Sequence, residues 1–506
     1  MKKILYTLLL GTSFLGFTQE STTQDALRYA IDNLNGTARF RGMSGAFGAV
    51  GGDLSAININ PAGSVFFNNN YASASVSSFN KNNKANYFGT NSKDFSSKLD
   101  INQLGAILVF NSNIEKSNDW NKIAVAINYE NNSNLNNNTS FSGLNPYNSI
   151  DSYFLRFANG LGNEGVFNVA NTGAYFEDLN FIDQQAWLGY NSYILEYDET
   201  NNIYFTNVPD SGNYIQRKNS SSVGYNSKVT ANVATSYKDK ISFGLNLNMH
   251  FTDFKNSTTI QESNNGLYAT GASISDITFK NDLYTFGNGF SLNLGIIAKA
   301  TEDLRFGIAY ESPTWFNLTD QLSQRVYTTR TEAPLDNDFI DESANPNVII
   351  EFAPYKIKTP SKWTGSMAYI IAKQGLISFD VTSKDYGSTK FKPTKDIVFN
   401  NLNKQMSATL KNTIDYRIGG EYKIKQFSLR AGYRFEESPY QTKITMSDLV
   451  GYSGGLGYNF GKSRLDLSYS NDKRDYNQKL VSSGMTDSAR IKQINNNVTV
   501  TYSVNF

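Results

Sequence analysis

Apolar and polar residues alternate along many short segments of this chain, and this pattern constrains the fold more than any other feature. In Val498–Phe506, valine, tyrosine and phenylalanine occupy every second position, with threonine, serine and asparagine between them. Ile241–Phe251 follows the same order. Side chains two positions apart share one face of a β-strand. The pattern therefore predicts strands with one apolar face and one polar face.

The alternation recurs in four more segments: Phe290–Ile296, Ile414–Lys423, Phe427–Glu436 and Arg464–Tyr469. In a soluble sandwich the polar face would be a solvated exterior. In a membrane barrel it would line a wet lumen, with the apolar face toward lipid.

The lengths of the connections separate these two readings. Tight joins, such as Thr301–Asp303 and Gly461–Ser463, alternate with long polar insertions. The longest insertions are Asn80–Asp100, Glu130–Ser222, Thr252–Leu283, Pro313–Ser361 and Tyr386–Lys411. Short turns at one end and long loops at the other are typical of outer-membrane barrels. The sequence therefore predicts an all-β fold, a transmembrane antiparallel β-barrel of about 14 strands between Tyr71 and Phe506.

The residue inventory argues against several classes of function. The chain has no cysteine, which excludes disulfides and cysteine-ligated metals, and its net charge of +1 gives no footprint for nucleic acid. The single histidine, His250, falls on the lumen face, where it does not suit a lipid-facing catalytic site. One histidine also cannot build an imidazole-rich metal site. We expect no enzymatic activity, no metal and no cofactor.

The N-terminus reads as an export signal. Lys2 and Lys3 precede the apolar run Ile4–Phe17, which is too short to span a bilayer and suits a secretory signal. The predicted organisation is a signal peptide over residues 1–18, a plug or hatch over 19–67, and a barrel over 68–506. The largest extracellular loop is expected at 130–222.

A glycine-rich segment, Thr37–Phe67, follows the export signal. Composition alone would allow a flexible linker, but the segment carries many apolar residues: Phe40, Met43, Phe47, Val50, Leu54, Ile57 and Ile59. A barrel of this size encloses a lumen that its own side chains do not fill. The segment is therefore predicted to be the plug. Its expected hatch or gate residues are Arg39, Arg41, Asp53, Asn60, Pro61, Ala62 and Gly63.

The largest insertion contains two apolar stripes at helical spacing. Six residues are candidates for capturing a hydrophobic ligand: Tyr153, Phe154, Phe157, Phe176, Leu179 and Trp187. Two alternatives remain open. The stripes form a structural lid of two packed helices or an exposed apolar platform for a ligand or partner, and the two are compatible, because a lid can also be a landing site.

Several charged residues fall on predicted lumen faces: Arg417, Glu421, Arg430, Arg434 and Arg464. A carboxylate head group of the ligand is expected to be met by Arg417, Arg430 or Arg434. We also expect Arg39, Arg41 and Asp53 of the plug to pair with lumen charges such as Glu421, Glu436 or Arg464.

The secretory signal, the segment Arg39–Gly63 with its run Asp53-Leu54-Ser55-Ala56-Ile57-Asn58-Ile59-Asn60-Pro61-Ala62-Gly63, and the barrel together resemble the FadL-type long-chain fatty-acid transporters. The resemblance implies a Gram-negative outer-membrane protein with an N-terminal hatch inside a fourteen-stranded barrel. It implies passive uptake of hydrophobic small molecules, captured between long loops and released through the barrel wall beside a kinked third strand near the Asn-Pro-Ala element.

Outer-membrane lipids and the barrel-assembly machinery would be partners of such a protein. The third predicted strand, Lys122–Tyr129, contains no glycine or proline that would mark a kink. The asparagine-rich style also resembles proteins of the Bacteroidetes, which use such barrels in a type IX secretion shuttle as well. A shuttle that binds secreted proteins is therefore the alternative function, and a general porin is a third.

Overall fold

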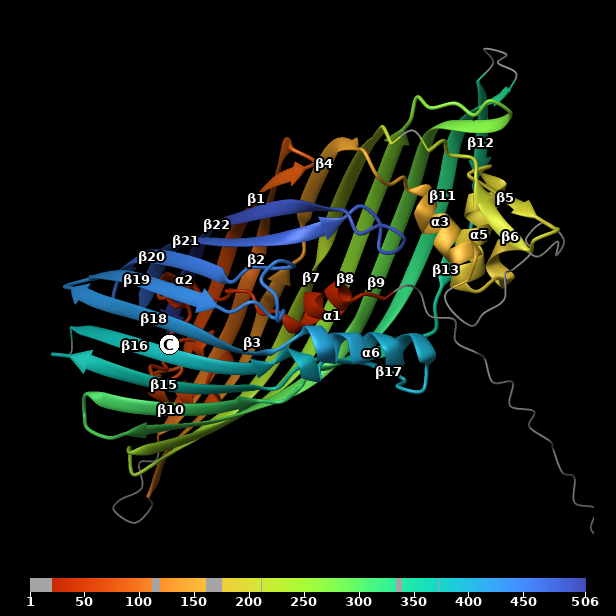
Figure 1. Ribbon diagram of the computed structural model, residues 1–506. Helices are drawn as coiled ribbons and strands as arrows, with labels where there is room; N and C mark the ends of the chain where they lie inside the picture. The colour runs from red at the N-terminus through yellow and green to blue at the C-terminus, as the bar shows by residue number, and fades with distance from the viewer. Residues whose placement is uncertain (1–20, 112–118, 161–174, 211, 334–338, 373) are drawn as a thin grey trace, which may run out of the picture.

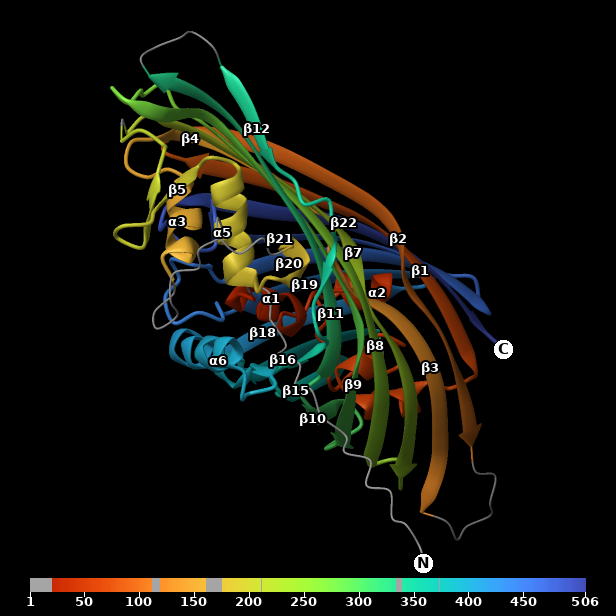
Figure 2. The ribbon, with the colours of Figure 1, turned by 90° about the vertical axis from the view of Figure 1, so that its right-hand side faces the viewer.

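The computed structural model describes residues 21–111, 119–160, 175–210, 212–333, 339–372 and 374–506. The predicted signal peptide lies outside these residues. The chain forms a closed antiparallel barrel of 14 strands, as the alternation predicted, with the N-terminal helices inside it (Figures 1 and 2). Among the described residues, none of the helices is long and apolar enough to cross a membrane.

The strands of the main sheet are β1 (Tyr71–Tyr87), β2 (Thr90–Asn111), β3 (Trp120–Asn134), β4 (Asn137–Asn145), β7 (Tyr214–Tyr237), β8 (Ile241–Ser263), β9 (Gly271–Lys299), β10 (Leu304–Glu311), β11 (Trp315–Ala333), β12 (Ile340–Ala344), β13 (Ile350–Glu351), β14 (Tyr355–Lys358), β15 (Lys362–Ile371), β16 (Gly375–Asp385), β17 (Lys390–Lys392), β18 (Asn412–Ile424), β19 (Phe427–Glu436), β20 (Leu449–Asn459), β21 (Ser463–Lys479) and β22 (Ser488–Asn505). A separate hairpin joins β5 (Leu195–Asp198) to β6 (Ile203–Thr206).

The helices are α1 (Thr23–Ala30), α2 (Ala38–Gly42), α3 (Asp151–Ala158), α5 (Phe181–Asn191) and α6 (Ile397–Thr409). Short 3₁₀ turns are η1 (Ala56–Asn58), η2 (Pro61–Phe66), η3 (Phe176–Asp178) and η4 (Tyr386–Ser388).

The first and last strands close the barrel. β1 pairs with β22 over sixteen residue pairs, from Tyr71 opposite Asn505 to Asn86 opposite Arg490. Closure leaves no free edge along these two strands, so their backbone groups are paired at membrane depth, where water cannot satisfy them.

Side chains alternate across the wall as predicted. In β22, Thr499 and Thr501 are buried in the lumen, whereas Val500 and Tyr502 are exposed on the outside. The outward residues form the apolar surface that a lipid bilayer covers.

The strands are longer than the sequence analysis expected. Much of the predicted insertions Asn80–Asp100 and Thr252–Leu283 is regular strand, and β1 joins β2 through a two-residue turn at Phe88-Gly89. Both turn residues have positive φ, which is the hairpin turn that glycine favours. The predicted insertion Glu130–Ser222 likewise begins in strand residues, those of β3 and β4, and ends in β7. These polar strands hydrogen-bond to one another above the apolar band, where hydrophobic periodicity gives no signal.

Inside the barrel, α1, α2, η1 and η2 form a plug, the red elements of Figure 2. Two apolar clusters fix the plug to the wall. One is built around Phe40, Met43 and Phe47, and the other around Leu54, Ile57 and Val65. A third cluster joins α1 to α6, and a fourth lies under α3 and α5 at the long-loop end.

Candidate functional site

Asn60 anchors the Asn-Pro-Ala-Gly turn of the plug. Its Oδ1 accepts a hydrogen bond from the Ala62 amide at 3.1 Å. Its Nδ2 donates to the carbonyls of Gly48 at 2.9 Å and Ile296 at 3.1 Å. Pro61 stands at the first position of η2, where a missing N–H costs little. One side chain thereby ties the turn both to the rest of the plug and to β9.

Asparagines on the wall donate to backbone carbonyls of the plug. The pairs are Asn102 to Gly36 at 2.6 Å, Asn128 to Leu54 at 3.4 Å, Asn232 to Pro61 at 3.1 Å, Asn246 to Ile57 at 2.7 Å and Asn293 to Asn58 at 3.2 Å. Because the plug has little regular structure, many of its carbonyls need partners from outside. The sequence analysis did not single out these asparagines. Their only signal was asparagine on lumen positions of the alternating strands.

Wall glycines let the plug approach closely. A Cβ at Gly244 would lie 2.2 Å from the Pro61 carbonyl carbon, and one at Gly295 would lie 2.0 Å from Asn60 Oδ1. Against the other side of the plug, a Cβ at Gly432 would lie 2.4 Å from the Met43 carbonyl carbon. Each of these distances is shorter than any van der Waals contact, so only hydrogen fits. These glycines are site residues that the sequence analysis did not name.

Arg39 joins the plug to the barrel. Its Nε donates to Glu421 Oε2 at 2.9 Å, and its Nη1 donates to the Gly52 carbonyl at 3.0 Å. Glu421 also accepts from Arg430 Nε at 2.6 Å. The pairing of Arg39 with Glu421 is one of those expected from the sequence.

Arg41 and Asp53 have different partners from those expected. Arg41 is buried and donates to Ser470 at 3.0 Å, and burial lowers the pKa of Arg41 to about 10. Asp53 accepts from the Thr37 hydroxyl at 2.9 Å and from the Ser55 amide at 2.9 Å. Burial raises the pKa of Asp53 above its usual value. Asp53 therefore holds the plug's own shape, whereas Arg41 ties the plug to the neutral Ser470 of β21.

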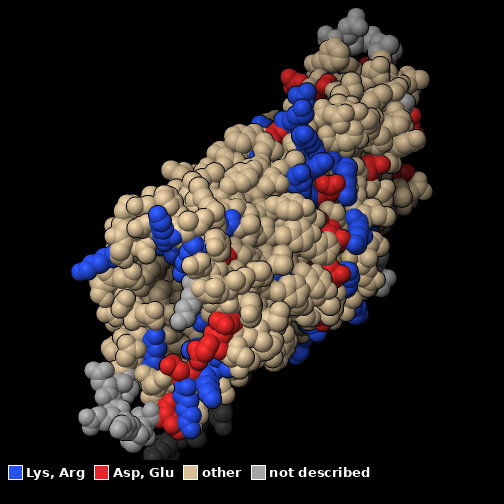
Figure 3. Space-filling view, turned by 90° about the vertical axis from the view of Figure 1, so that its left-hand side faces the viewer, with Lys and Arg blue, Asp and Glu red and all other residues tan. Residues whose placement is uncertain are grey.

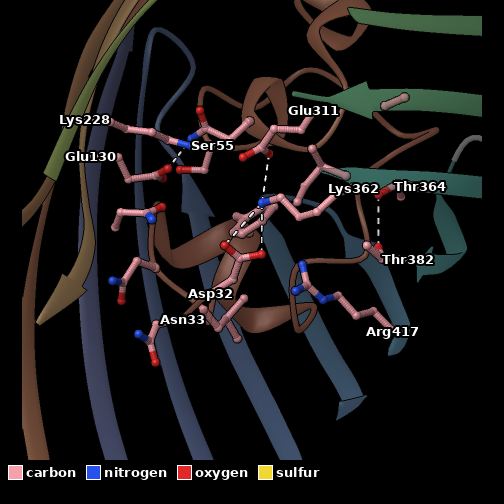
Figure 4. A pocket seen from close by; sticks show the side chains of 17 residues that line it. Asp32, Asn33, Ser55, Glu130, Lys228, Glu311, Lys362, Thr364, Thr382 and Arg417 are labelled. Atoms are coloured by element: carbon pink, nitrogen blue, oxygen red, sulfur yellow. Dashed lines mark hydrogen bonds and ion pairs between the residues drawn. The ribbon is translucent and has the colours of Figure 1, made fainter. Parts of the chain in front are cut away.

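Asp32 makes a second ionic link to the wall. Its Oδ2 lies 3.0 Å from Lys362 Nζ and 2.8 Å from Lys384 Nζ, and Lys362 also pairs with Glu311 at 2.9 Å. Figure 4 shows Asp32, Lys362 and Glu311 converging on a cavity of about 60 Å³. Burial alone would raise the pKa of Asp32, but the two lysines hold that pKa well below its usual value. The carboxylate therefore stays ionised while the plug is docked.

The predicted lumen arginines are all paired with carboxylates. Arg430 pairs with Asp466 at 2.8 Å, and Arg434 pairs with Glu436 at 2.9 Å. The remaining pairs are Arg434 with Asp472 at 2.8 Å, Arg417 with Glu436 at 3.7 Å and Arg464 with Asp466 at 3.0 Å. These residues form a fixed network around the plug, and none of their guanidinium groups lacks a carboxylate partner.

The six predicted capture residues are brought together at the long-loop end. Tyr153, Phe154 and Phe157 lie on α3 and are buried, as are Phe176 and Leu179. Trp187 on α5 is half-buried and packs edge-on against Phe176, with ring centroids 5.2 Å apart. Of the two alternatives, the structure has the packed lid, because the apolar stripes face inward rather than forming an exposed platform.

A cavity of about 190 Å³ lies under this lid. Apolar side chains dominate its lining, among them Tyr153, Phe181, Ile260, Phe279, Leu283, Leu322, Leu480 and Val481. At its border, Lys218 Nζ donates to the carbonyls of Lys479 at 2.9 Å and Leu480 at 2.8 Å. No carboxylate among the described residues forms an ion pair with Lys218. A larger cavity of about 760 Å³, bounded by α1, shares Lys218, Asn256 and Thr258 with the first.

The wall has a seam between its second and third spans. β3 pairs with β2 only from Lys122 to Glu130, and the rest of β3, like β4, pairs with β7 alone. The register of β3 against β7 shifts between Asn131 and Ser133. Residues 135–136, which belong to no strand, then separate β3 from β4. This interruption lies beyond the predicted bounds of the third strand, which explains why the regular segment Lys122–Tyr129 contained no sign of it.

Side chains bridge the seam. Asn131 Nδ2 donates to Asp100 at 3.3 Å, and the Ser140 amide donates to Asp94 at 2.6 Å. From the lumen, Asn33 and Asn35 of the plug donate to the Ser133 hydroxyl and the Asn131 carbonyl, each at 2.5 Å. The plug segment beside the seam is thus Asn33–Asn35, whereas the Asn-Pro-Ala turn packs on β7, β8 and β9.

His250 is buried in the lumen. Its Nε2 is 2.9 Å from the Ser291 hydroxyl, and its ring meets Phe316 edge-on. Among the described residues, no group of three or more histidine, cysteine, aspartate or glutamate side chains is arranged to hold a metal ion.

A closed fourteen-stranded barrel, apolar outside and filled by an N-terminal plug, is the architecture of an integral protein of the Gram-negative outer membrane. The sequence model of the outer membrane protein transport protein family (OMPP1/FadL/TodX) matches residues 213–506, more than half of the chain, and the chain belongs to that family. It is a FadL/TodX-type outer-membrane transporter of hydrophobic compounds, and the family consists of channels rather than enzymes.

Two solved structures, with TM-scores of 0.53 and 0.50, agree with this fold. A crystal structure of a Pseudomonas aeruginosa FadL homologue matches with a TM-score of 0.53 at 12% identity, over 94% of this chain and 100% of that chain. A TodX deltaS2S3 mutant, a monoaromatic hydrocarbon channel, matches with a TM-score of 0.50 at 14% identity, again over 94% and 100%. The Pseudomonas putida toluene transporter TodX matches with a TM-score of 0.49 at 14% identity, over 94% of this chain and 100% of that chain. A comparison with curated proteins finds no match.

Proposed function

We propose that this protein is a passive channel whose ligands are fatty-acid-like amphiphiles, captured under the extracellular lid and gated by the N-terminal plug. The observation that carries the proposal is the apolar cavity under α3 and α5 with Lys218 at its border. The apolar lining suits an alkyl chain, and the removal of that chain from water supplies affinity at roughly 25 cal/mol per Å². The Lys218 ammonium suits a carboxylate.

The capture residues divide into two roles in this proposal. Tyr153 lines the cavity and contacts the ligand. Phe154, Phe157, Phe176 and Trp187 pack behind it and shape the lid, in which Leu179 is also buried. The head group is met by Lys218 rather than by Arg417, Arg430 or Arg434, because those arginines already have carboxylate partners.

The plug is the proposed gate, since it lies inside the barrel (Figure 2) and its helix α1 borders the cavity of about 760 Å³. The proposed exit is the seam beside β3, where side-chain hydrogen bonds replace backbone pairing and Asn33 and Asn35 block the lumen side. Withdrawal of these two asparagines would connect the lumen with the seam. No covalent or energy-consuming step is needed for such a path.

The test compares two ligands of equal chain length, a long-chain fatty acid and the corresponding alkane, bound to purified protein in detergent. Lys218→Gln should weaken fatty-acid binding about tenfold, the equivalent of 1.4 kcal/mol, and leave alkane binding unchanged. Arg217→Gln is the matched control, because Arg217 is the neighbouring residue on the outer face of β7. Equal losses for both ligands, or no binding of either, would contradict the proposal.

A further inference from the structure

The periplasmic mouth of the barrel contains a cavity that the transport proposal does not use. Short turns mark this end as periplasmic. The cavity has a volume of about 620 Å³, and the plug segments Val50–Gly52 and Val65–Phe66 form part of its lining. Figure 3 looks toward this end, where lysine and arginine side chains gather around a hollow in the surface. Its size falls within the range of small-molecule sites.

Cations outnumber carboxylates in the lining. The basic residues are Arg39, Lys122, Lys299, Arg305, Lys423 and Arg464, and the acidic ones are Asp239 and Glu421. Glu421 is already shared by Arg39, Arg430 and Arg464, at 2.9, 2.6 and 3.7 Å. Within the part of the chain that the structure describes, no ion pair is formed by Lys122, Lys299, Arg305 or Lys423. The cavity therefore keeps an excess of positive charge.

Arg305 is held in place as an anion receptor would be. Its Nη1 donates to the Val50 carbonyl of the plug at 3.1 Å, and its guanidinium lies over the Phe66 ring at 4.4 Å. Its Nε is buried and has no hydrogen-bond partner among the described residues. Lys299 lies over the same ring at 5.7 Å. A guanidinium fixed by its neighbours loses little entropy when it binds an anion.

We infer that this cavity, called the vestibule below, is a binding site for a small anion that carries a carboxylate or phosphate group. Walls of one charge sign concentrate counter-ions in a cleft. The site faces the lumen and the periplasm rather than the lipid, which favours a dissolved anion over a bilayer head group. Two sources share this chemistry: a soluble periplasmic anion, and the head group of cargo that reaches the periplasmic side of the plug instead of leaving through the seam.

The vestibule also contacts the gate. Arg39 lines it while holding both Glu421 and the Gly52 carbonyl. An anion bound there competes with these two acceptors for the Arg39 guanidinium. Occupancy of the vestibule therefore weakens one of the links between plug and wall.

The test is isothermal titration calorimetry of the full protein in detergent at low ionic strength, with inorganic phosphate and with octanoate. We expect saturable binding that weakens as salt is added, because screening acts on exposed charge pairs. The double variant Lys299→Gln with Lys423→Gln should lose about tenfold in affinity for the bound anion. Lys255→Gln is the control, an exposed lysine on β8 far from the vestibule along its strand.

The two probes distinguish the sources. Octanoate that binds much more tightly than phosphate indicates the cargo head group, and comparable binding indicates a soluble anion. No saturable heat from either probe, or an affinity that the double variant leaves unchanged, would overturn the inference. Octanoate also fits the cavity beside Lys218, so each titration is repeated with Lys218→Gln. Binding that this variant retains belongs to the vestibule, and the transport proposal therefore stands or fails separately. Retained heat-modifiable gel mobility shows that the variant barrel is folded.

Discussion

At the residue scale, a few wall glycines allow the plug to lie close to the barrel wall, because they carry a hydrogen atom where other residues carry a side chain. Gly244 and Gly295 face Asn60 and Pro61 at distances that exclude any side chain. Glycine in a strand otherwise weakens it, so its presence here marks a close backbone approach.

The first prediction concerns Gly244→Val. The added side chain collides with the Pro61 backbone and should disfavour plug docking by about 1–3 kcal/mol. Ion conductance in planar bilayers should rise above that of the wild type, while heat-modifiable gel mobility is retained. Gly365→Val is the matched control, because a Cβ at Gly365 in β15 meets nothing within 4 Å. Equal conductance in the two variants would contradict a tight fit between plug and wall.

The second prediction concerns pH. The docked plug lowers the pKa of Asp32, because Lys362 and Lys384 favour its charged form despite burial. A lowered carboxyl pKa stabilises docking above the ordinary value of about 3.9, and this contribution is lost as pH falls through the lower docked-state value. The contribution of Asp32 to docking should therefore be constant between about pH 5 and pH 8, and the conductance that it suppresses should rise only in strong acid.

Asp32→Asn provides the comparison for this prediction. The variant lacks the carboxylate, so its conductance should be higher than that of the wild type at neutral pH, with a smaller rise in acid. A wild-type conductance that changes steeply near neutral pH would show that another group controls docking.

At the element scale, the seam beside β3 separates two kinds of wall. Elsewhere neighbouring strands share backbone hydrogen bonds, whereas β2 and the later part of β3 are joined by side chains such as Asn131 and Asp100. Opening the side-chain bridges costs less than opening a ladder, because it does not break a row of backbone N–H···O=C hydrogen bonds.

The third prediction uses the absence of native cysteine. A disulfide between Asp100→Cys and Asn131→Cys should lock the seam and reduce uptake of a labelled fatty acid, with recovery on reduction. The control disulfide, Ser77→Cys with Asp100→Cys, joins a pair that is already opposed in the β1–β2 ladder. Undiminished uptake through the locked seam would place the exit elsewhere.

The sequence predicted elements better than their contacts. Alternation identified the strands because lipid and lumen impose a period of two. The two apolar stripes became α3 and α5, except that Phe176 lies in the short turn η3 and Leu179 follows it. Strand ends were missed because polar ladders above the membrane, such as Asn80–Tyr87, carry no hydrophobic signal. Lys218 and Asn33 were missed for a different reason. Their roles depend on neighbours far along the chain, and local pattern does not encode such neighbours.

At the scale of the whole molecule, barrel and plug are held by different forces. The barrel is a continuous backbone ladder around its circumference, and the plug is held by asparagine amides, two ionic links and small apolar clusters. The barrel should therefore survive without the plug.

The fourth prediction follows from that division. Deletion of residues 37–63 should leave a folded, β-rich barrel by circular dichroism and raise its conductance well above that of the nearly closed wild type. Replacement of Pro61 and Gly63 together should instead slow hydrophobic uptake without opening an ion path. Unchanged conductance after the deletion would mean that these residues do not close the lumen.

The pairing of β1 with β22 also has a consequence for biogenesis. Tyr71 is opposite Asn505, so the ladder that completes the cylinder joins positions more than 400 residues apart. Contacts so distant in sequence form slowly, because the intervening chain must first be ordered. Until β22 pairs with β1, the free edge of β1 and the free edge of the most recently formed strand expose unpaired backbone groups that invite aggregation. The emerging polypeptide must therefore be kept apart from its copies throughout its passage across the periplasm.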